Sequence, residues 1–181
     1  MNFQTTTIEG AFVIDPERIS DERGFFARTW SDRELLDRGL DAQLVQCSLS
    51  FNVRAGTLRG MHYQLPPHAE TKLVRCTSGA IWDVIVDLRE DSPTFLRHFA
   101  VELSMENRRM LYIPKGLAHG YQTLTDASEV FYQMSAAYAP THARGVRWND
   151  PRFGIAWPDA AERVMNERDR TYADFVPGAP R

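Results

Sequence analysis

Short runs in which hydrophobic and polar residues alternate occupy most of the chain between about residue 43 and residue 138. In residues 81–88, large side chains such as Trp82 and Val84 fall on one face, and Asp83 falls on the other. This period of two is that of a β-strand. Further short strands are predicted at residues 99–103, 110–113 and 130–134. Strands this short and closely spaced predict a mainly-β sandwich or barrel rather than a parallel α/β sheet.

The N-terminal part of the chain adds strands and one short helix to this prediction. Aromatic and β-branched residues favour strands within residues 3–30, and residues 25–30 form an aromatic run of this kind. Ser31 and Glu34 then have the spacing of a helix capping box, and Gly39 stands where a glycine often ends a helix. A surface helix of about two turns is therefore predicted between them.

The C-terminal tail, residues 157–181, is polar, and only a weak helix is predicted in it, at about residues 160–167. No repeat of fixed period and no low-complexity tract interrupts the chain. We therefore predict a single domain over residues 1–181, with a barrel core at about residues 43–138.

Composition and charge exclude several classes of protein. Of the 181 residues, 43% are hydrophobic and 25% are charged, as in an ordinary soluble globular protein. The net charge of −3 gives no basic surplus for nucleic acid, and no apolar run approaches the length of a membrane span. Because the N-terminus lacks the pattern of a signal peptide, the cytoplasm is the expected location. Cys47 and Cys76 are not closely spaced, and both are expected to be reduced, buried thiols.

Four titratable residues, His62, Lys72, His119 and Tyr132, stand in strand or turn contexts. His62 follows Gly60, and a glycine inside a strand often marks a bulge or the close approach of another segment. An imidazole can transfer protons near neutral pH. Taken singly, each of the four has a structural interpretation, because core histidines, core tyrosines and solvated lysines are more common than catalytic ones.

Several motifs, taken together, resemble those of the dTDP-4-dehydrorhamnose 3,5-epimerase family. They are LRGMHYQ at residues 58–64, KLV at 72–74, IPKGLAHG at 113–120, Tyr132, GVRWNDP at 145–151 and GIAWP at 154–158. The resemblance runs in order from Gly10 to about Arg170. It implies a cupin-type jelly-roll barrel with short peripheral helices, a homodimer, and no metal or organic cofactor. It also implies epimerisation of a nucleoside-diphosphate 4-keto-6-deoxyhexose in deoxysugar biosynthesis.

The resemblance further implies roles for individual residues. Epimerisation beside a ketone needs a base on one face of the sugar, an acid on the other, and a positive group near the enolate oxygen. These roles fall to His62, Tyr132 and Lys72 respectively, and Asp169 would orient His62, although Asn166 stands where the family usually has Ser. The implied substrate-binding residues are Arg23, Gln46, Arg59, His119, Tyr138 and Arg168.

Three positions around the implied nucleotide site depart from the family pattern. Arg28 stands where the family usually has Glu, Ser48 where it has Asn, and Ala143 where it has Glu. Losing two carboxylates and an amide would change the hydrogen bonding around the nucleotide. The sequence therefore leaves open a nucleoside diphosphate other than dTDP, and also whether one or both carbons beside the ketone are epimerised.

The relation of Arg59 to His62 admits two geometries. Residues three apart in a regular strand face opposite sides, so both reach one site only through a bulge at Gly60, or through Arg59 reaching a partner subunit or the barrel rim. We favour the bulge.

Two other classes of function also remain open. A metal-binding cupin would use His62, His68, Glu70 and His119, although Gln64 interrupts the usual close histidine pair. The other is a non-catalytic sugar-binding barrel, which would not require the combination of base, acid and lysine.

Overall fold

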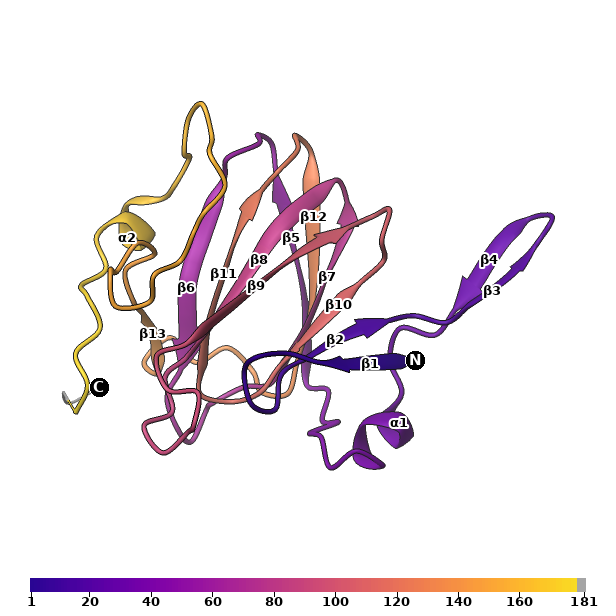
Figure 1. Cartoon of the computed structure of the whole chain (residues 1–181), viewed down its shortest axis with the longest axis horizontal. Helices are drawn as coiled ribbons and strands as arrows, with labels where there is room; N and C mark the ends of the chain where they lie inside the picture. The colour runs from indigo at the N-terminus through magenta and orange to yellow at the C-terminus, as the bar shows by residue number, and fades with distance from the viewer. Residues whose placement is uncertain (179–181) are drawn as a thin grey trace.

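Two antiparallel sheets face each other in the computed structural model, which describes residues 1–178 (Figure 1). The first sheet has six strands in the order β1-β2-β10-β7-β12-β5. Their bounds are β1 Asn2–Thr5, β2 Phe12–Asp15, β10 Met110–Ile113, β7 Lys72–Ser78, β12 Ser128–Met134 and β5 Gln46–Asn52. The second sheet has five strands in the order β13-β6-β11-β8-β9. Their bounds are β13 Ala143–Gly145, β6 Leu58–Gln64, β11 Leu117–Thr123, β8 Ala80–Asp87 and β9 His98–Ser104.

From β5 to β13 the chain crosses from one sheet to the other at every step except the β8–β9 hairpin. This crossing closes the two sheets into a jelly roll, so the predicted mainly-β barrel is confirmed. Strands β1, β2 and β13 come from outside residues 43–138 and extend the two sheets. A separate ribbon of β3 (Arg18–Asp21) and β4 (Gly24–Ala27) projects from the body (Figure 1).

The hydrophobic core lies between the sheets and is built from alternate residues of each strand. Val74 and Val130 of the six-stranded sheet pack against Ile81, Ile85 and Tyr121 of the five-stranded sheet, all of them buried. Burying one such aliphatic side chain contributes on the order of 2 kcal/mol. The core thus fixes the separation of the two sheets.

The other face of the five-stranded sheet is also covered. Val84, Val86 and Leu88 of β8 and the following turn pack with Phe153 and Phe175 of the C-terminal segment. The two faces predicted for residues 81–88 are therefore confirmed, and both are buried. This packing brings the C-terminal tail alongside β6.

The predicted helix after Ser31 is confirmed as α1 (Asp32–Leu36), where the Ser31 side chain accepts a hydrogen bond from the Glu34 amide. The predicted helix at residues 160–167 is wrong. Val164 instead pairs with the start of β6, because its backbone exchanges hydrogen bonds with Gly56 and Leu58 at 3.0 and 2.9 Å. The helix of the tail is α2 (Glu167–Arg170), which begins after Asn166.

Two smaller expectations also need correction. The strand predicted at residues 25–30 ends at Ala27, and Ser31, the N-cap of α1, has an extended backbone. Cys76 is buried as expected, but Cys47 is exposed, because strand alternation turns it to the outer face of β5. No helix among residues 1–178 is long and apolar enough to span a membrane.

Candidate active site

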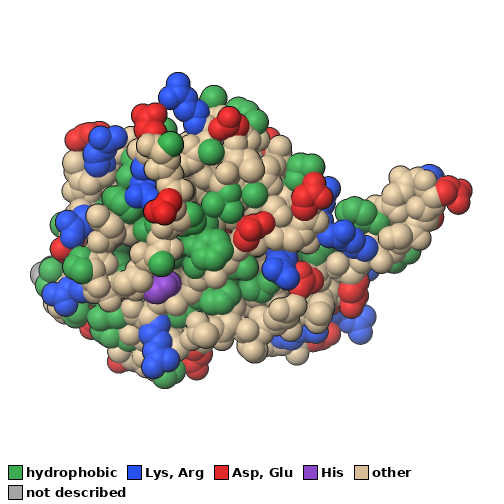
Figure 2. Space-filling model, turned by 45° about the horizontal axis from the view of Figure 1, so that its top comes forward, with side chains coloured by type: hydrophobic (Ala, Val, Ile, Leu, Met, Phe, Trp, Pro, Cys, Tyr) green, Lys and Arg blue, Asp and Glu red, His purple; other side chains and the backbone are tan. Residues whose placement is uncertain are grey.

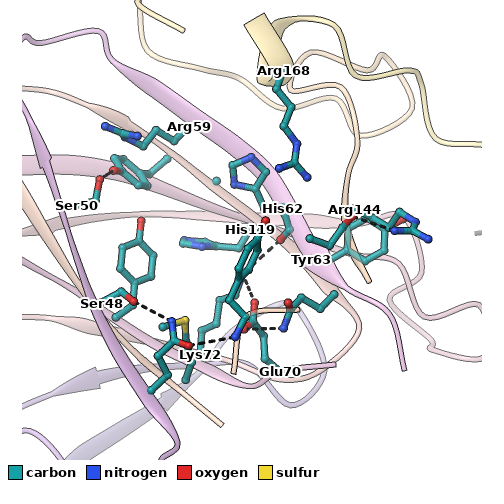
Figure 3. A pocket seen from close by; sticks show the side chains of 18 residues that line it. Ser48, Ser50, Arg59, His62, Tyr63, Glu70, Lys72, His119, Arg144 and Arg168 are labelled. Atoms are coloured by element: carbon teal, nitrogen blue, oxygen red, sulfur yellow. Dashed lines mark hydrogen bonds and ion pairs between the residues drawn. The ribbon is translucent and has the colours of Figure 1, made fainter. Parts of the chain in front are cut away.

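A cavity of about 390 Å³ lies between the two sheets (Figure 3). Strands β5, β7 and β12 of one sheet and β6 and β11 of the other supply most of its lining. The predicted site residues that line it are Gln46, Arg59, His62, Lys72, His119, Tyr132, Tyr138 and Arg168. The structure therefore brings eight of the ten predicted residues around one cavity.

Asp169 lies directly behind His62. Its Oδ1 is 2.7 Å from His62 Nε2, and its Oδ2 accepts a hydrogen bond from the Gly60 amide at 3.0 Å. The carboxylate is buried, whereas the His62 side chain is 42% exposed toward the cavity. Burial by itself would raise the pKa of Asp169, but the hydrogen bond and charge of His62, with the Gly60 amide and the Arg168 charge, hold that pKa below its usual value. Asp169 is therefore an ionised partner that fixes the orientation of the imidazole.

The N-terminus of α2 holds this carboxylate in place. Asn166 caps the helix by accepting a hydrogen bond from the Asp169 amide at 2.7 Å. The same helix directs Arg168 toward His62 at the cavity (Figure 3). The ring of Tyr172, just beyond the helix, meets His62 edge to face with centroids 6.0 Å apart.

Tyr172 has room beside His62 only because residue 145 is a glycine. A Cβ on Gly145 would lie 2.2 Å from the Tyr172 ring. The C-terminal tail thus supports the histidine through both a carboxylate and an aromatic ring.

Lys72 is held by a carboxylate in the cavity wall. Its Nζ lies 3.1 Å from Glu70 Oε1, and the other Glu70 oxygen accepts a hydrogen bond from Gln64 Nε2 at 3.2 Å. Lys72 Nζ also donates to the backbone oxygen of His62 at 3.5 Å. These contacts keep the ammonium group beside His62.

His119 lies opposite His62 on the neighbouring strand and is almost fully buried. Its Nε2 is 2.8 Å from Asp83 Oδ1, and its ring meets Tyr132 edge to face with centroids 6.0 Å apart. Tyr132 projects inward from β12, on the opposite sheet from His62. Burial raises the pKa of Tyr132 well above its ordinary value, so the phenol carries its proton at neutral pH.

A bulge in β6 brings Arg59 and His62 to the same cavity. His119 pairs with His62 and Tyr121 pairs with Arg59, so two steps along β11 match three steps along β6. Gly60 lies at this shift with a φ of +130°, and a Cβ there would be 2.5 Å from Gly120 Cα. The bulge favoured from the sequence is confirmed, and its tight packing explains the glycine.

Known proteins are similar to this chain over nearly its whole length. The sequence model of a family described as dTDP-4-dehydrorhamnose 3,5-epimerase matches residues 5–176. The dTDP-4-dehydrorhamnose 3,5-epimerase of Sinorhizobium fredii is 41% identical over 169 residues, which cover 93% of this chain and 87% of that protein. The chain belongs to the dTDP-4-dehydrorhamnose 3,5-epimerase family. It is therefore an isomerase of the carbohydrate epimerase type.

Solved structures of family members agree with the fold. The dTDP-4-dehydrorhamnose 3,5-epimerase of Elizabethkingia anophelis matches with a TM-score of 0.94 and 34% identity, over 97% of this chain and 96% of that one. The Legionella pneumophila enzyme, solved in complex with dTDP-4-keto-L-rhamnose, matches with a TM-score of 0.90 and 33% identity, over 96% and 92%. The cupin-type fold implied by the family resemblance is confirmed.

One predicted site residue of this epimerase-family chain lies far from the cavity. Arg23 is at the turn of the β3–β4 ribbon, where its side chain is 84% exposed and pairs with Asp21. Arg28, one of the three departures from the family pattern, follows the ribbon and pairs with Glu34 at 3.0 Å. The other two departures, Ser48 and Ala143, do line the cavity.

The donors of the alternative metal site do not converge. Glu70 is bonded to Lys72 and Gln64, and the His68 ring contacts that of His142 at a tilt of 50°, with centroids 4.4 Å apart. In residues 1–178, no group of three or more His, Cys, Asp or Glu side chains is placed to hold a metal ion.

Sequence reasoning missed several residues of the site, among them Asp83 and Tyr121. Asp83 is a charged residue on the inward face of β8, where a carboxylate needs a polar partner. Its place in the strand could therefore have indicated that it pairs with another polar side chain, which is His119. Tyr121 follows His119 by two residues on β11, so strand alternation predicts that both face the cavity.

Proposed function

We propose that the protein is a dTDP-4-dehydrorhamnose 3,5-epimerase, which inverts the two carbons beside the ketone of a dTDP-linked 4-keto-6-deoxyhexose. One observation carries the proposal: His62 and Tyr132 project into the same cavity from opposite sheets. A sugar ring between them would present one face to a base and the other to an acid. Epimerisation requires that arrangement.

His62 is the base. The Asp169 carboxylate can only accept a hydrogen bond, so His62 Nε2 carries the proton of their 2.7 Å contact, and Nδ1 keeps its lone pair. When Nδ1 takes a proton from the carbon, the imidazolium that forms is stabilised by the buried carboxylate. Solvent then exchanges that proton.

Lys72 stabilises the enolate. Removing the proton moves negative charge onto the ketone oxygen, and a fixed ammonium group near that oxygen lowers the barrier. The bonds of Lys72 to Glu70 and to the His62 carbonyl hold its Nζ within the same part of the cavity as the base. His119, with its buried partner Asp83, adds a second polar group beside the sugar position.

Tyr132 is the acid. Its raised pKa keeps the phenol protonated, so it can deliver a proton to the carbon from the face opposite His62. The carbon gains a C–H bond as the enolate electrons collapse, and the phenolate left behind regains its proton from solvent. The net result is inversion at that carbon.

The nucleotide lies toward the outer part of the cavity. Arg59 and Arg168 provide positive charge for the diphosphate, since a guanidinium donates to two oxygens at once. Tyr138 is an exposed aromatic residue of the cavity lining, and its amide is bonded to Gln46 Oε1 at 3.1 Å. Binding of dTDP, UDP, CDP and GDP tests the nucleotide directly. We expect dTDP to bind most tightly. Tighter binding of another nucleoside diphosphate would assign the substrate to that nucleotide instead, and the neutral residues Ser48 and Ala143 would then explain the changed preference.

A homodimer is part of this proposal. Figure 2 shows the β3–β4 ribbon as an arm with hydrophobic side chains on it, and Phe26 on the ribbon is 70% exposed. The outer face of β5 and the residue that follows the strand are also apolar, with Leu49, Phe51 and Val53 exposed. A second copy covering these surfaces would remove them from water. Arg23 could then reach the cavity of that second copy. Sedimentation of the protein, with Phe26→Asp as the disrupting variant, tests the dimer.

The decisive experiment follows the substrate in deuterated water by NMR. We expect deuterium at both carbons beside the ketone, together with the epimerised product. Label at a single carbon would restrict the enzyme to one inversion, and absence of label would exclude the proposed reaction. His62→Asn should abolish the exchange, and unchanged exchange would overturn the assignment of the base.

A further inference from the structure

The last residue of β5, Asn52, supports Arg59 from within the barrel wall. Asn52 is 2% exposed and is not part of the cavity lining, which Arg59 reaches from β6. Its Oδ1 accepts a hydrogen bond from Arg59 Nε at 2.8 Å. Arg59 itself is exposed, and Figure 3 shows its side chain at the cavity near Ser50. A buried amide thus holds an exposed arginine.

The direction of the Asn52 amide follows from its neighbours. Arg59 Nε can only donate, so the atom 2.8 Å from it is the amide oxygen. The Ser128 carbonyl can only accept, so the atom 3.1 Å from it is Nδ2, and the two assignments agree. The Tyr121 hydroxyl lies 3.1 Å from Nδ2, 3.2 Å from Oδ1 and 2.9 Å from Ser50 Oγ. The amide is therefore held in one orientation, with its oxygen toward Arg59.

The support of Arg59 carries no charge. The arginines that pair with a carboxylate are Arg23, Arg28, Arg54, Arg89, Arg109 and Arg147. Within residues 1–178, Arg59 has no such partner, and its side chain donates only to Asn52 and, from Nη2 at 3.5 Å, to the Phe51 carbonyl. The guanidinium is therefore fixed through Nε while its positive charge stays uncompensated.

We propose that Asn52 is a positioning residue for Arg59: its amide oxygen fixes the guanidinium at the cavity without neutralising it, so that the terminal nitrogens bind the diphosphate of the nucleotide. This inference rests on the proposed function, in which Arg59 binds the diphosphate. An arginine that is already held has lost its side-chain freedom on folding and does not lose it again on binding. A carboxylate in the place of Asn52 would also hold the side chain, but it would compete with the phosphates for the positive charge.

The consequence for the enzyme is an effect on binding and not on the chemical step. The diphosphate is common to all nucleoside diphosphates, so the contribution of Asn52 should be independent of the base. Loss of an interaction made equally in the ground state and the transition state raises KM and leaves kcat unchanged. A distorted barrel would instead lower kcat, because His62 and Tyr132 come from opposite sheets.

Two substitutions separate the position of Arg59 from its charge. Asn52→Ala removes the support and adds no charge, whereas Asn52→Asp keeps an oxygen for Arg59 and adds a negative charge beside it. The matched controls are Asn107→Ala and Asn107→Asp, because the Asn107 side chain also accepts and donates hydrogen bonds but lies outside the cavity lining. Calorimetric titration at low and high salt gives the affinity of each protein for dTDP and UDP, and steady-state kinetics gives kcat and KM.

We expect Asn52→Ala to weaken binding about ten-fold, by the same factor for each of the two nucleotides that the unmodified protein binds. KM should rise by a similar factor, and kcat should change by less than about two-fold. Asn52→Asp should weaken binding at least as much, and its affinity should depend less on salt, because the charge of Arg59 is then compensated. Combined with Arg59→Gln, neither substitution should weaken binding further, and the Asn107 variants should bind as the unmodified protein does.

Unchanged affinity in Asn52→Ala would overturn the proposal. A further loss in the double variant with Arg59→Gln would also overturn it, since Asn52 would then act through another group, and so would a fall in kcat in place of the rise in KM. If the alanine variant does not fold, Asn52→Asp decides the question, and an unchanged affinity there would overturn the proposal equally.

The proposed function fails in a different way. Absence of deuterium exchange in the unmodified protein would overturn the epimerase reaction, while the nucleotide affinities would still test Asn52. If the unmodified protein bound neither dTDP nor UDP, the diphosphate site and this inference would be overturned together.

Discussion

His62 and Asp169 are 107 residues apart in the chain, yet His62 Nε2 lies 2.7 Å from Asp169 Oδ1. The first residue is on a strand of the barrel and the second is on a helix of one turn in the tail. Packing of the C-terminal segment on the outer face of the five-stranded sheet brings the two together. The orientation of His62, the proposed base, therefore depends on a tail that contributes no strand to the centre of the barrel.

Replacing Asp169 with Asn should impair catalysis far more than binding. The amide cannot stabilise imidazolium, and it can donate to His62 Nε2 and so favour the wrong tautomer. We expect kcat to fall by about a hundred-fold or more. Asp174→Asn is the control, because Asp174 is in the same tail but pairs with Arg147. Steady-state kinetics would contradict the assignment if both variants lost activity equally.

Replacing Glu70 with Gln should slow formation of the enolate. The variant keeps the shape of the side chain but removes the negative charge 3.1 Å from Lys72 Nζ, so the ammonium group is no longer fixed beside His62. We expect deuterium exchange and epimerisation to fall together by about ten-fold, with their ratio unchanged. A fall in epimerisation alone would show that Glu70 acts on the acid instead.

Gly60→Ala should disrupt the bulge that brings Arg59 and His62 together. The new Cβ would meet Gly120 Cα at 2.5 Å, so β6 and β11 would have to separate. We expect a loss of about 2 kcal/mol or more in the free energy of unfolding, together with loss of activity. Gly154→Ala is the matched control, since Gly154 also has a positive φ, of +60°, but has open space around it. Equal destabilisation of the two variants, measured by denaturant unfolding, would contradict the steric explanation.

The stability of the barrel should fall in acid partly through Asp87. Burial would raise the pKa of this carboxyl, but hydrogen bonds from Arg89, Ser92 and Thr94 hold the pKa below its usual value. The Asp87 carboxylate therefore binds a proton more readily in the unfolded chain than in the folded one. Its contribution to the free energy of unfolding is complete above about pH 4 and is lost as the pH falls through the lowered pKa.

Asp87→Asn provides the test of this pH dependence. We expect it to lower the free energy of unfolding at pH 7 by about 3 kcal/mol, because Arg89 loses its buried partner. The variant should also lose less stability than the unmodified protein between pH 5 and pH 3, when Tm is measured across that range. Identical pH dependence of the two proteins would exclude Asp87 as a source of acid sensitivity.

Much of the cavity could be anticipated from local sequence. His119 and Tyr121 on β11, and Tyr132 and Met134 on β12, line the cavity because residues two apart in a strand share a face. The same rule fails at Arg59 and His62, where the register shift at Gly60 decides the outcome. It also says nothing of Arg23, whose ribbon leaves the barrel altogether.

By itself, the sequence determined the strand periodicity, the mainly-β class and the kinds of side chain available for proton transfer, because these depend on residues adjacent in the chain. Only the tertiary structure decided which of those side chains meet. Asp169 reaches His62, Asp83 reaches His119 and Tyr121 reaches Ser50 through sheet pairing and packing of segments distant in sequence. The tail also shows this difference between local sequence and tertiary contact. Pairing of Val164 with the start of β6 prevents the helix that local propensity favours, and the helical turn lies at Glu167–Arg170 instead. Side-chain direction is a local property of the backbone, whereas contact between distant strands is settled by burial of the whole core.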